Sequence, residues 1–230
     1  MAETETKSGA GTDIGAGTQF GTEPGSVVTS VVPRVRAVRP TEAQMEAARD
    51  TTISDVVGPN LRVLFCGINP GLWSAAVDAH FARPGNRFWP ALHGSGFTSE
   101  LLGPSRQREV IPLGLGLTNV AARATARADE LSDDEIREGG RILLAKLEQL
   151  RPRWIAVLGI GAYRTAFGRK KATVGPQPEL LAHSKVWVLP NPSGLNAHWT
   201  AATLAEEFGR LRAAAREANP RVGGSPETDK

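Results

Sequence analysis

A repeated pattern limits the fold of this chain more than any other feature: a short apolar run of strand length is followed at once by a polar turn. The first run, Leu61–Cys66, leads directly into the turn Gly67–Gly71, with the sequence GINPG. Comparable runs lie at residues 111–120, 154–158 and 185–190. Short apolar runs bounded by Gly, Pro and Asn are typical of buried strands. We therefore predict a strand at each of these places.

Helix signals separate the predicted strands. Ser132 and Glu135 form a capping-box pattern, so a helix is expected from there to Leu150. A final helix is expected to begin at or next to Thr200, because Leu204 and the apolar residues after it recur at helical spacing. Strands that alternate with helices predict an α/β fold in which a mostly parallel sheet is covered on both faces.

Three polar turns follow predicted strands. They contain Asn69, the pair Thr118-Asn119 and the stretch Asn191–Asn196. Because the carboxyl ends of parallel strands meet at one edge of a sheet, these turns are expected to share a single cleft. The alternative is that Asn69 only forms hydrogen bonds within its own turn.

The ends of the chain differ in composition from its middle. Residues 1–50 are predicted to be a disordered tail with a basic linker, because Gly, Thr, Ser and Glu dominate the start and arginines follow. A short helix capped by Thr41 is expected inside the linker. Residues 51–218 hold enough apolar residues for one core and are predicted to form one domain. Residues 219–230 return to Pro, Gly and Ser and are predicted to be flexible.

Several kinds of chemistry have no matching motif. Cys66 is the only cysteine, which excludes an internal disulfide, a zinc knuckle and a four-cysteine iron–sulfur cluster. Its place in an apolar run predicts a buried structural thiol. The four histidines lack the spacing of metal ligands, and the motifs G-x-x-x-x-G-K-[ST], G-x-S-x-G and H-E-x-x-H are absent. We expect neither a metal nor a cofactor.

Charge and hydropathy limit the cellular location and the class of binding partner that we expect. The chain has no apolar run long enough to span a bilayer, and its first residues lack the basic start and the apolar segment of a signal peptide. We therefore expect a soluble, cytoplasmic protein without a membrane partner. The net charge of +3 permits an anionic partner such as DNA without requiring one.

Four motifs, in order along the chain, resemble those of one enzyme family. They are FCGINPGL at residues 65–72, PGNRFW at residues 84–89 with Phe81 ahead of it, GLTN at residues 116–119 and LPNPSGL at residues 189–195. On these motifs, the chain from about Ser54 to Leu211 resembles the mismatch-specific uracil/thymine-DNA glycosylases, a branch of the uracil-DNA glycosylase superfamily. The resemblance implies a three-layer α/β/α sandwich around a short, mostly parallel sheet.

The resemblance implies that Asn69 is the catalytic residue. It would hold the water that attacks C1′ of the deoxyribose after the target nucleotide has been flipped out of the duplex. A carboxamide has no useful basicity near neutral pH, so Asn69 would position and polarise this water without deprotonating it fully. Phe81 would stack on the flipped base, and a phenylalanine of the core is the alternative. The other implied base-pocket residues are Gly67, Ile68, Pro70, Gly71, Ser74, Thr118 and Asn119.

The LPNPSGL motif implies contacts to the duplex. Leu195 would fill the gap left by the flipped nucleotide, and the backbone around it would contact the widowed guanine. A plain connection between a strand and a helix is the alternative. The residues expected in this role are Asn191, Pro192, Ser193, Gly194, Leu195 and Asn196, and those considered for phosphate contacts are Arg87, Arg123 and His198.

The resemblance thus implies a monofunctional, monomeric DNA glycosylase that hydrolyses the N-glycosidic bond of uracil opposite guanine in double-stranded DNA, initiating base excision repair. Thymine and ethenocytosine opposite guanine are further candidate bases. For thymine, the bulky Trp73 argues against removal and Thr118-Asn119 argues for it. Two alternatives stay open: a DNA-binding module that detects mismatches without excision, and a small-molecule nucleoside hydrolase.

Overall fold

The computed structural model of the chain describes residues 39–194, 196 and 198–217. The chain divides into two units, residues 1–36 and 37–230, and all described residues belong to the second. The predicted C-terminal tail and most of the predicted N-terminal tail lie outside the described residues. The fold below is therefore that of the second unit.

A five-stranded sheet with the strand order β2-β1-β3-β5-β4 forms the centre of this unit. The strands are β1 (Val63–Gly67), β2 (Leu115–Asn119), β3 (Trp154–Leu158), β4 (Gly175–Leu181) and β5 (Ser184–Leu189). The pairs β1–β2, β1–β3 and β3–β5 are parallel, and β4 is antiparallel to β5. Every residue of β1 and β3 is buried, as expected for strands covered on both faces. The prediction of an α/β sandwich around a mostly parallel sheet is confirmed.

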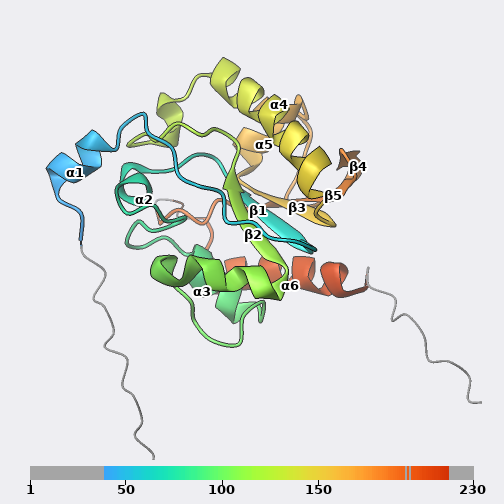
Figure 1. Cartoon of the computed structure of the whole chain (residues 1–230). Helices are drawn as coiled ribbons and strands as arrows, with labels where there is room; N and C mark the ends of the chain where they lie inside the picture. The colour runs from blue at the N-terminus through green and yellow to red at the C-terminus, as the bar shows by residue number, and fades with distance from the viewer. Residues whose placement is uncertain (1–38, 195, 197, 218–230) are drawn as a thin grey trace, which may run out of the picture. The chain divides into compact units, whose positions relative to one another are not determined.

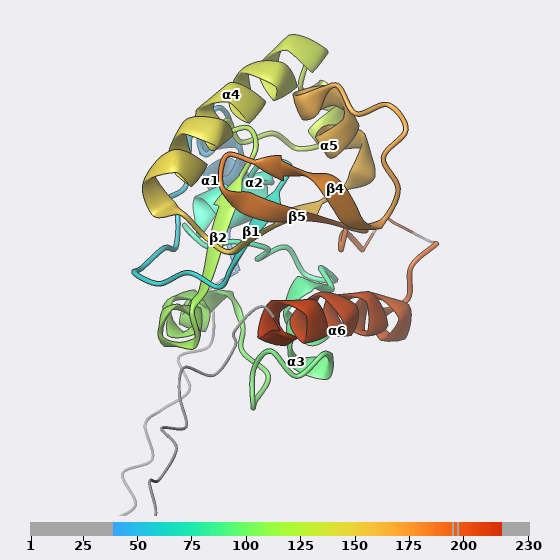
Figure 2. The ribbon, with the colours of Figure 1, turned by 90° about the vertical axis from the view of Figure 1, so that its right-hand side faces the viewer.

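Helices cover both faces of the sheet (Figures 1 and 2). α4 (Asp133–Leu150) and α5 (Ile160–Phe167) lie on one face, and α3 (Phe88–Gly94) and α6 (Ala201–Glu217) lie on the other. The predicted capping box of Ser132 is present at the start of α4. Apolar side chains of α3 and α6 belong to one core cluster, and those of α4 and α5 belong to a second. None of the described helices combines the length and the apolar character that crossing a membrane requires.

Described residues that precede the predicted domain boundary in sequence already contact the domain. α1 (Glu42–Ala47) begins at the predicted cap Thr41, which forms a capping box. Just after this helix, Arg49 Nη1 lies 3.0 Å from Glu130 Oε2. The boundary at residue 51 stays a prediction, although residues before it already contact the domain.

Two elements differ from those predicted. β4 was not predicted, and its Pro176 and Pro178 lack the N–H groups that a central strand needs. The structure places β4 at the sheet edge, where such prolines are tolerated, and its register shifts between Pro176 and Leu180. The strand predicted at residues 111–120 is shorter than expected, because the 3-10 helix η1 (Pro104–Leu113) occupies its first residues.

Candidate active site

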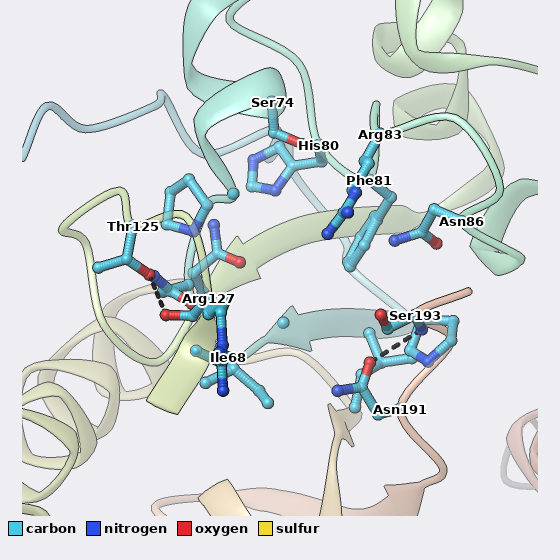
Figure 3. Close-up of a pocket in the computed structure, with 18 of the residues that line it drawn as sticks. Ile68, Ser74, His80, Phe81, Arg83, Asn86, Thr125, Arg127, Asn191 and Ser193 are labelled. Atoms are coloured by element: carbon cyan, nitrogen blue, oxygen red, sulfur yellow. Dashed lines mark hydrogen bonds between the residues drawn. The ribbon is translucent and has the colours of Figure 1, made fainter. Parts of the chain in front are cut away.

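The three polar turns meet at the carboxyl edge of the sheet and border one open cavity of about 720 Å³. Gly67 pairs with Asn119 at the ends of β1 and β2, so these two turns start at the same level. In Figure 3, Phe81 approaches the cavity from one side, Asn191 from the opposite side and Thr125 from a third. The predicted site residues that line the cavity are Gly67, Ile68, Asn69, Pro70, Gly71, Ser74, Phe81, Asn119, Asn191, Pro192, Ser193 and Asn196.

The carboxamide of Asn69 is held in one orientation. Its Nδ2 donates to the carbonyl oxygen of Arg123 at 2.9 Å and to Thr125 Oγ1 at 2.7 Å. A backbone carbonyl only accepts, so the atom that faces Arg123 must be the nitrogen, and Oδ1 points the other way. Oδ1 accepts no hydrogen bond from any described residue. Because Asn69 lines the cavity, this oxygen is available to a water or a ligand.

The two partners of Asn69 Nδ2 belong to the loop that carries Arg123 and Thr125, and not to the turn that carries Asn69 itself. Thr125 donates its hydroxyl proton to the carbonyl of Arg127 at 2.7 Å, which leaves its lone pairs for Asn69. Two backbone hydrogen bonds, both of 3.1 Å, join the two loops. The N–H of Thr125 donates to the carbonyl of Pro70, and the N–H of Leu72 donates to the carbonyl of Thr125. Leu72 is the first residue of α2 (Leu72–Ala76). The alternative in which Asn69 forms hydrogen bonds only within its own turn is therefore wrong.

We expect Thr125→Val to slow the reaction of this site about tenfold. Valine has nearly the same shape as threonine but cannot accept the hydrogen bond from Asn69 Nδ2, so the carboxamide gains freedom to rotate. The test is a single-turnover rate measurement beside a thermal melt. Thr173→Val, on the loop before β4, is the matched control. A rate equal to that of the wild type would show that the bond to Arg123 is sufficient.

Backbone groups form the cavity wall next to Asn69. A Cβ atom on Gly67 would lie 2.5 Å from Asn119 Oδ1 and 3.2 Å from the Phe81 ring, so this close approach requires glycine. The N–H groups of Ile68 and Asn69 donate to no described carbonyl. Backbone N–H donors beside a cavity wall that carries no side chain at Gly67 suit a planar ring with carbonyl oxygens.

Phe81 places one face of its ring on the core. Its centroid lies 4.0 Å from that of Phe88, with an angle of 22° between the planes. Ser74 is buried, and its Oγ accepts the N–H of Ala82 at 3.0 Å, which holds the segment that carries Phe81. Phe81 is only partly buried and lines the cavity, so it has both a core contact and an accessible surface.

Thr118 lies behind the cavity wall. Its side chain is fully buried, and its Oγ1 donates to Asp55 Oδ1 at 2.7 Å. Lys146 Nζ approaches the other oxygen of Asp55 at 2.7 Å. Because side chains alternate along a strand, Thr118 and Asn119 point to opposite faces of β2. The prediction that both residues face the same pocket is therefore corrected: Asn119 lines the cavity and Thr118 does not.

Residues 191–199, here named the 191–199 loop, connect β5 to α6. Asn191 Oδ1 accepts the N–H of Ser193 at 3.0 Å (Figure 3), and Asn196 Nδ2 donates to the carbonyl of Asn191 at 3.0 Å. Such local side-chain bonds are typical of asparagine turns. Leu195, the predicted wedge, lies outside the described residues.

The three residues considered for phosphate contacts lie in different surroundings. Arg123 forms ion pairs through Nε with Glu135 at 2.7 Å and through Nη1 with Asp50 at 2.8 Å. The hydrogen bond from Arg123 to Glu135 lowers the pKa of that carboxyl group to about 2. Arg87 donates to backbone carbonyls of the 191–199 loop. His198 is exposed. The phosphate contacts of these residues stay predictions.

Two arginines that the sequence analysis did not single out line the cavity. Arg127, just before the 3-10 turn η2 (Ala128–Glu130), forms an ion pair with Asp129. Arg83 is exposed, and no described residue forms an ion pair or hydrogen bond with its guanidinium. Its position one residue before the PGNRFW motif is the signal that could have revealed it.

His80 is a further cavity residue that no sequence motif indicates. It is 1% exposed, and its Nε2 lies 3.0 Å from the carbonyl oxygen of Ser54. A carbonyl only accepts, so Nε2 carries a proton in the neutral ring and Nδ1 is left as an acceptor. Burial lowers the pKa of His80 below its ordinary value of 6.5. The neutral form is therefore the one present at pH 7.

The lowered pKa of His80 predicts a loss of stability in mild acid. Below pH 6.5 the unfolded chain takes up a proton at this residue while the folded chain does not, so the free energy of unfolding falls, by at most about 1.4 kcal/mol per pH unit. His80→Gln keeps a donor for Ser54 but does not titrate. Urea unfolding at pH 7.5 and 5.5 should show a smaller pH effect in this variant. An equal pH effect in both proteins would assign it to other groups.

Cys66 lies beneath the site and takes no part in its surface. Its side chain is fully buried, and burial raises the pKa of the thiol. The thiol therefore stays protonated, in agreement with the predicted structural role. Within the described part of the chain, no three His, Cys, Asp or Glu side chains gather as metal ligands do.

A comparison with protein-family models shows to which family this chain is related. The model described as the uracil DNA glycosylase superfamily matches residues 54–215. The match includes the strands, the cavity turns and the 191–199 loop. Members of this superfamily are DNA glycosylases, which hydrolyse N-glycosidic bonds. Because the match covers well over half of the chain and includes every predicted site residue that lines the cavity, the chain belongs to the uracil-DNA glycosylase superfamily.

Proposed function

We propose that this protein is a monofunctional DNA glycosylase that removes uracil mispaired with guanine from double-stranded DNA. The observation that carries the proposal is the fixed carboxamide of Asn69, whose Oδ1 accepts no hydrogen bond from a described residue. Asn69 lines the same cavity as Phe81 and described residues of the 191–199 loop. These three parts suit three tasks: holding a water, stacking on a flipped base and entering the duplex.

In the proposed reaction, the bond from C1′ of the deoxyribose to the pyrimidine nitrogen breaks, and water forms a bond to C1′. The bonding electron pair leaves with the pyrimidine, and the proton released by the water finally neutralises the departed base. Asn69 is neutral and cannot take this proton early, so the sugar must develop oxocarbenium character before the water attacks. None of the described lysines lines the cavity, which favours direct hydrolysis over a Schiff-base intermediate.

The leaving base would receive electrostatic help from the backbone. As the bond breaks, negative charge spreads onto the carbonyl oxygens of the pyrimidine. The N–H groups of Ile68 and Asn69 have no described acceptor, so they are available to that charge. Donors of this kind contribute about a hundredfold to a thousandfold in other enzymes.

The cavity also bears on the choice between uracil and thymine. Trp73, whose bulk argued against thymine, does not line the cavity, and Arg39 lies over its ring at 5.6 Å. The small side chain of Ser74 borders the cavity instead. We therefore include thymine opposite guanine among the proposed substrates. Arg83 is our candidate for a phosphate contact, because its guanidinium has no partner among the described residues.

The experiment that tests the function is a base-release assay with the wild-type protein. Duplexes that carry uracil, thymine or ethenocytosine opposite guanine, and uracil opposite adenine, are incubated and then treated with alkali, which cleaves abasic sites. We expect excision of uracil opposite guanine, and no strand cleavage before the alkali step. Tight mismatch binding without base release would favour the binding module, and hydrolysis of free deoxyuridine alone would favour the nucleoside hydrolase.

A further inference from the structure

We infer that Arg87 is the residue that positions the 191–199 loop for contact with the base opposite the flipped nucleotide, an inference that rests on the proposed function. Arg87 is the N-cap residue of α3. Its Nη1 donates to the carbonyl of Trp199, and its Nη2 donates to the carbonyls of Ser193 and Asn196, the latter at 2.8 Å. One guanidinium therefore binds three described residues of this loop.

Backbone contacts strengthen this attachment. The N–H of Arg87 donates to the carbonyl of Pro192 at 2.9 Å. Independently, a Cβ atom on Gly194 would lie 2.7 Å from the carbonyl oxygen of Gly85, so the loop backbone rests directly on the segment before α3. Two separate observations thus place the loop against residues 85–87.

The chemistry of Arg87 fits this role better than a phosphate contact. Its Nε is buried without a described partner, and the residue does not line the cavity. No described carboxylate pairs with it, so its charge is met by carbonyl oxygens of the loop. The planar guanidinium spreads its donors over two terminal nitrogens and can bind several separated carbonyls at once, whereas the three donors of a lysine ammonium share one nitrogen and reach less far. The guanidinium is therefore committed to the loop.

The test uses two duplexes that differ only opposite the uracil. One carries guanine there and the other carries an abasic site, so only the first offers a base for the loop to contact. We expect Arg87→Met to lower the single-turnover excision rate about tenfold or more on the guanine duplex and by less than about threefold on the other. Arg87→Lys should restore part of the loss. Arg141→Met, which removes an exposed arginine on α4, is the matched control and should match the wild type on both duplexes.

Gly194→Ala provides a second, independent disturbance and should give the same selective loss, because its methyl group would push the loop away from Gly85. Thermal melts accompany every variant. Equal losses on both duplexes, or complete rescue by Arg87→Lys, would overturn the inference. A wild-type protein that releases no base from either duplex would instead refute the proposed function.

Discussion

Asn69→Ala is expected to excise uracil opposite guanine at least about a hundredfold more slowly than the wild type in single-turnover assays. Alanine removes Oδ1, the oxygen that would hold the attacking water, while it leaves the backbone N–H donors of the turn in place. Duplex binding should change little, because the carboxamide acts on the reacting atoms and not on the phosphates. Rates from base release and affinities from fluorescence anisotropy separate the two effects.

A matched variant distinguishes this chemistry from general damage to the cavity. Asn86 also lines the cavity, but its Oδ1 accepts the N–H of Phe88 at 2.9 Å, next to the start of α3. Asn86→Ala should lower the melting temperature and reduce the rate far less than Asn69→Ala. If Asn69→Ala retained the wild-type rate, or lost DNA binding in proportion to its rate, Asn69 would not be the residue that holds the water.

Phe81→Leu is expected to lower kcat/KM about five- to a hundredfold, because stacking on an aromatic ring contributes about 1–3 kcal/mol per base. Leucine keeps an apolar contact with Phe88 but offers no flat π surface to a flipped base. The loss should be similar for uracil and thymine, since stacking discriminates poorly between bases. Steady-state kinetics on the two mismatches measure it.

The control for Phe81 is a ring of the core that does not border the cavity. Phe97 is 8% exposed, and its ring centroid lies 5.4 Å from that of Phe65. Phe97→Leu should reduce stability and leave kcat/KM unchanged. If Phe81→Leu behaved in the same way, the alternative of a core phenylalanine would be correct and the base would have to be held by other groups.

Local patterns predicted those parts of the fold that depend on neighbouring residues. The capping boxes of Thr41 and Ser132 involve residues three positions apart, and both are present. The strand at residues 154–158 is an uninterrupted apolar run and has the predicted bounds. β4 was missed because its prolines are acceptable only at an edge, and the position of a strand in a sheet is a tertiary property.

In the candidate site, too, features set by local sequence were predicted and features set by tertiary contacts were not. Asn69 and Asn191 follow strands and Asn119 is the last residue of one, so the parallel sheet brings them to one cavity as expected. Thr125 and His80 could not be predicted from a local pattern. Thr125 contacts Asn69 across 56 residues of chain, and His80 contacts Ser54 across 26. Motifs indicated which residues line the cavity, whereas the residues that hold them in place depend on long-range packing.

The prolines of β4 have a consequence for self-association. An exposed strand edge with free N–H and carbonyl groups can recruit a strand from another molecule, and proline on the edge is one of the features that prevent this. At the opposite border of the sheet, Val56 exchanges backbone hydrogen bonds with Leu117 of β2 at 2.9 and 2.8 Å and thus caps part of that edge. Both margins are therefore poor templates for intermolecular strand addition, so concentrated solutions should resist the fibrous aggregation to which open sheets are prone.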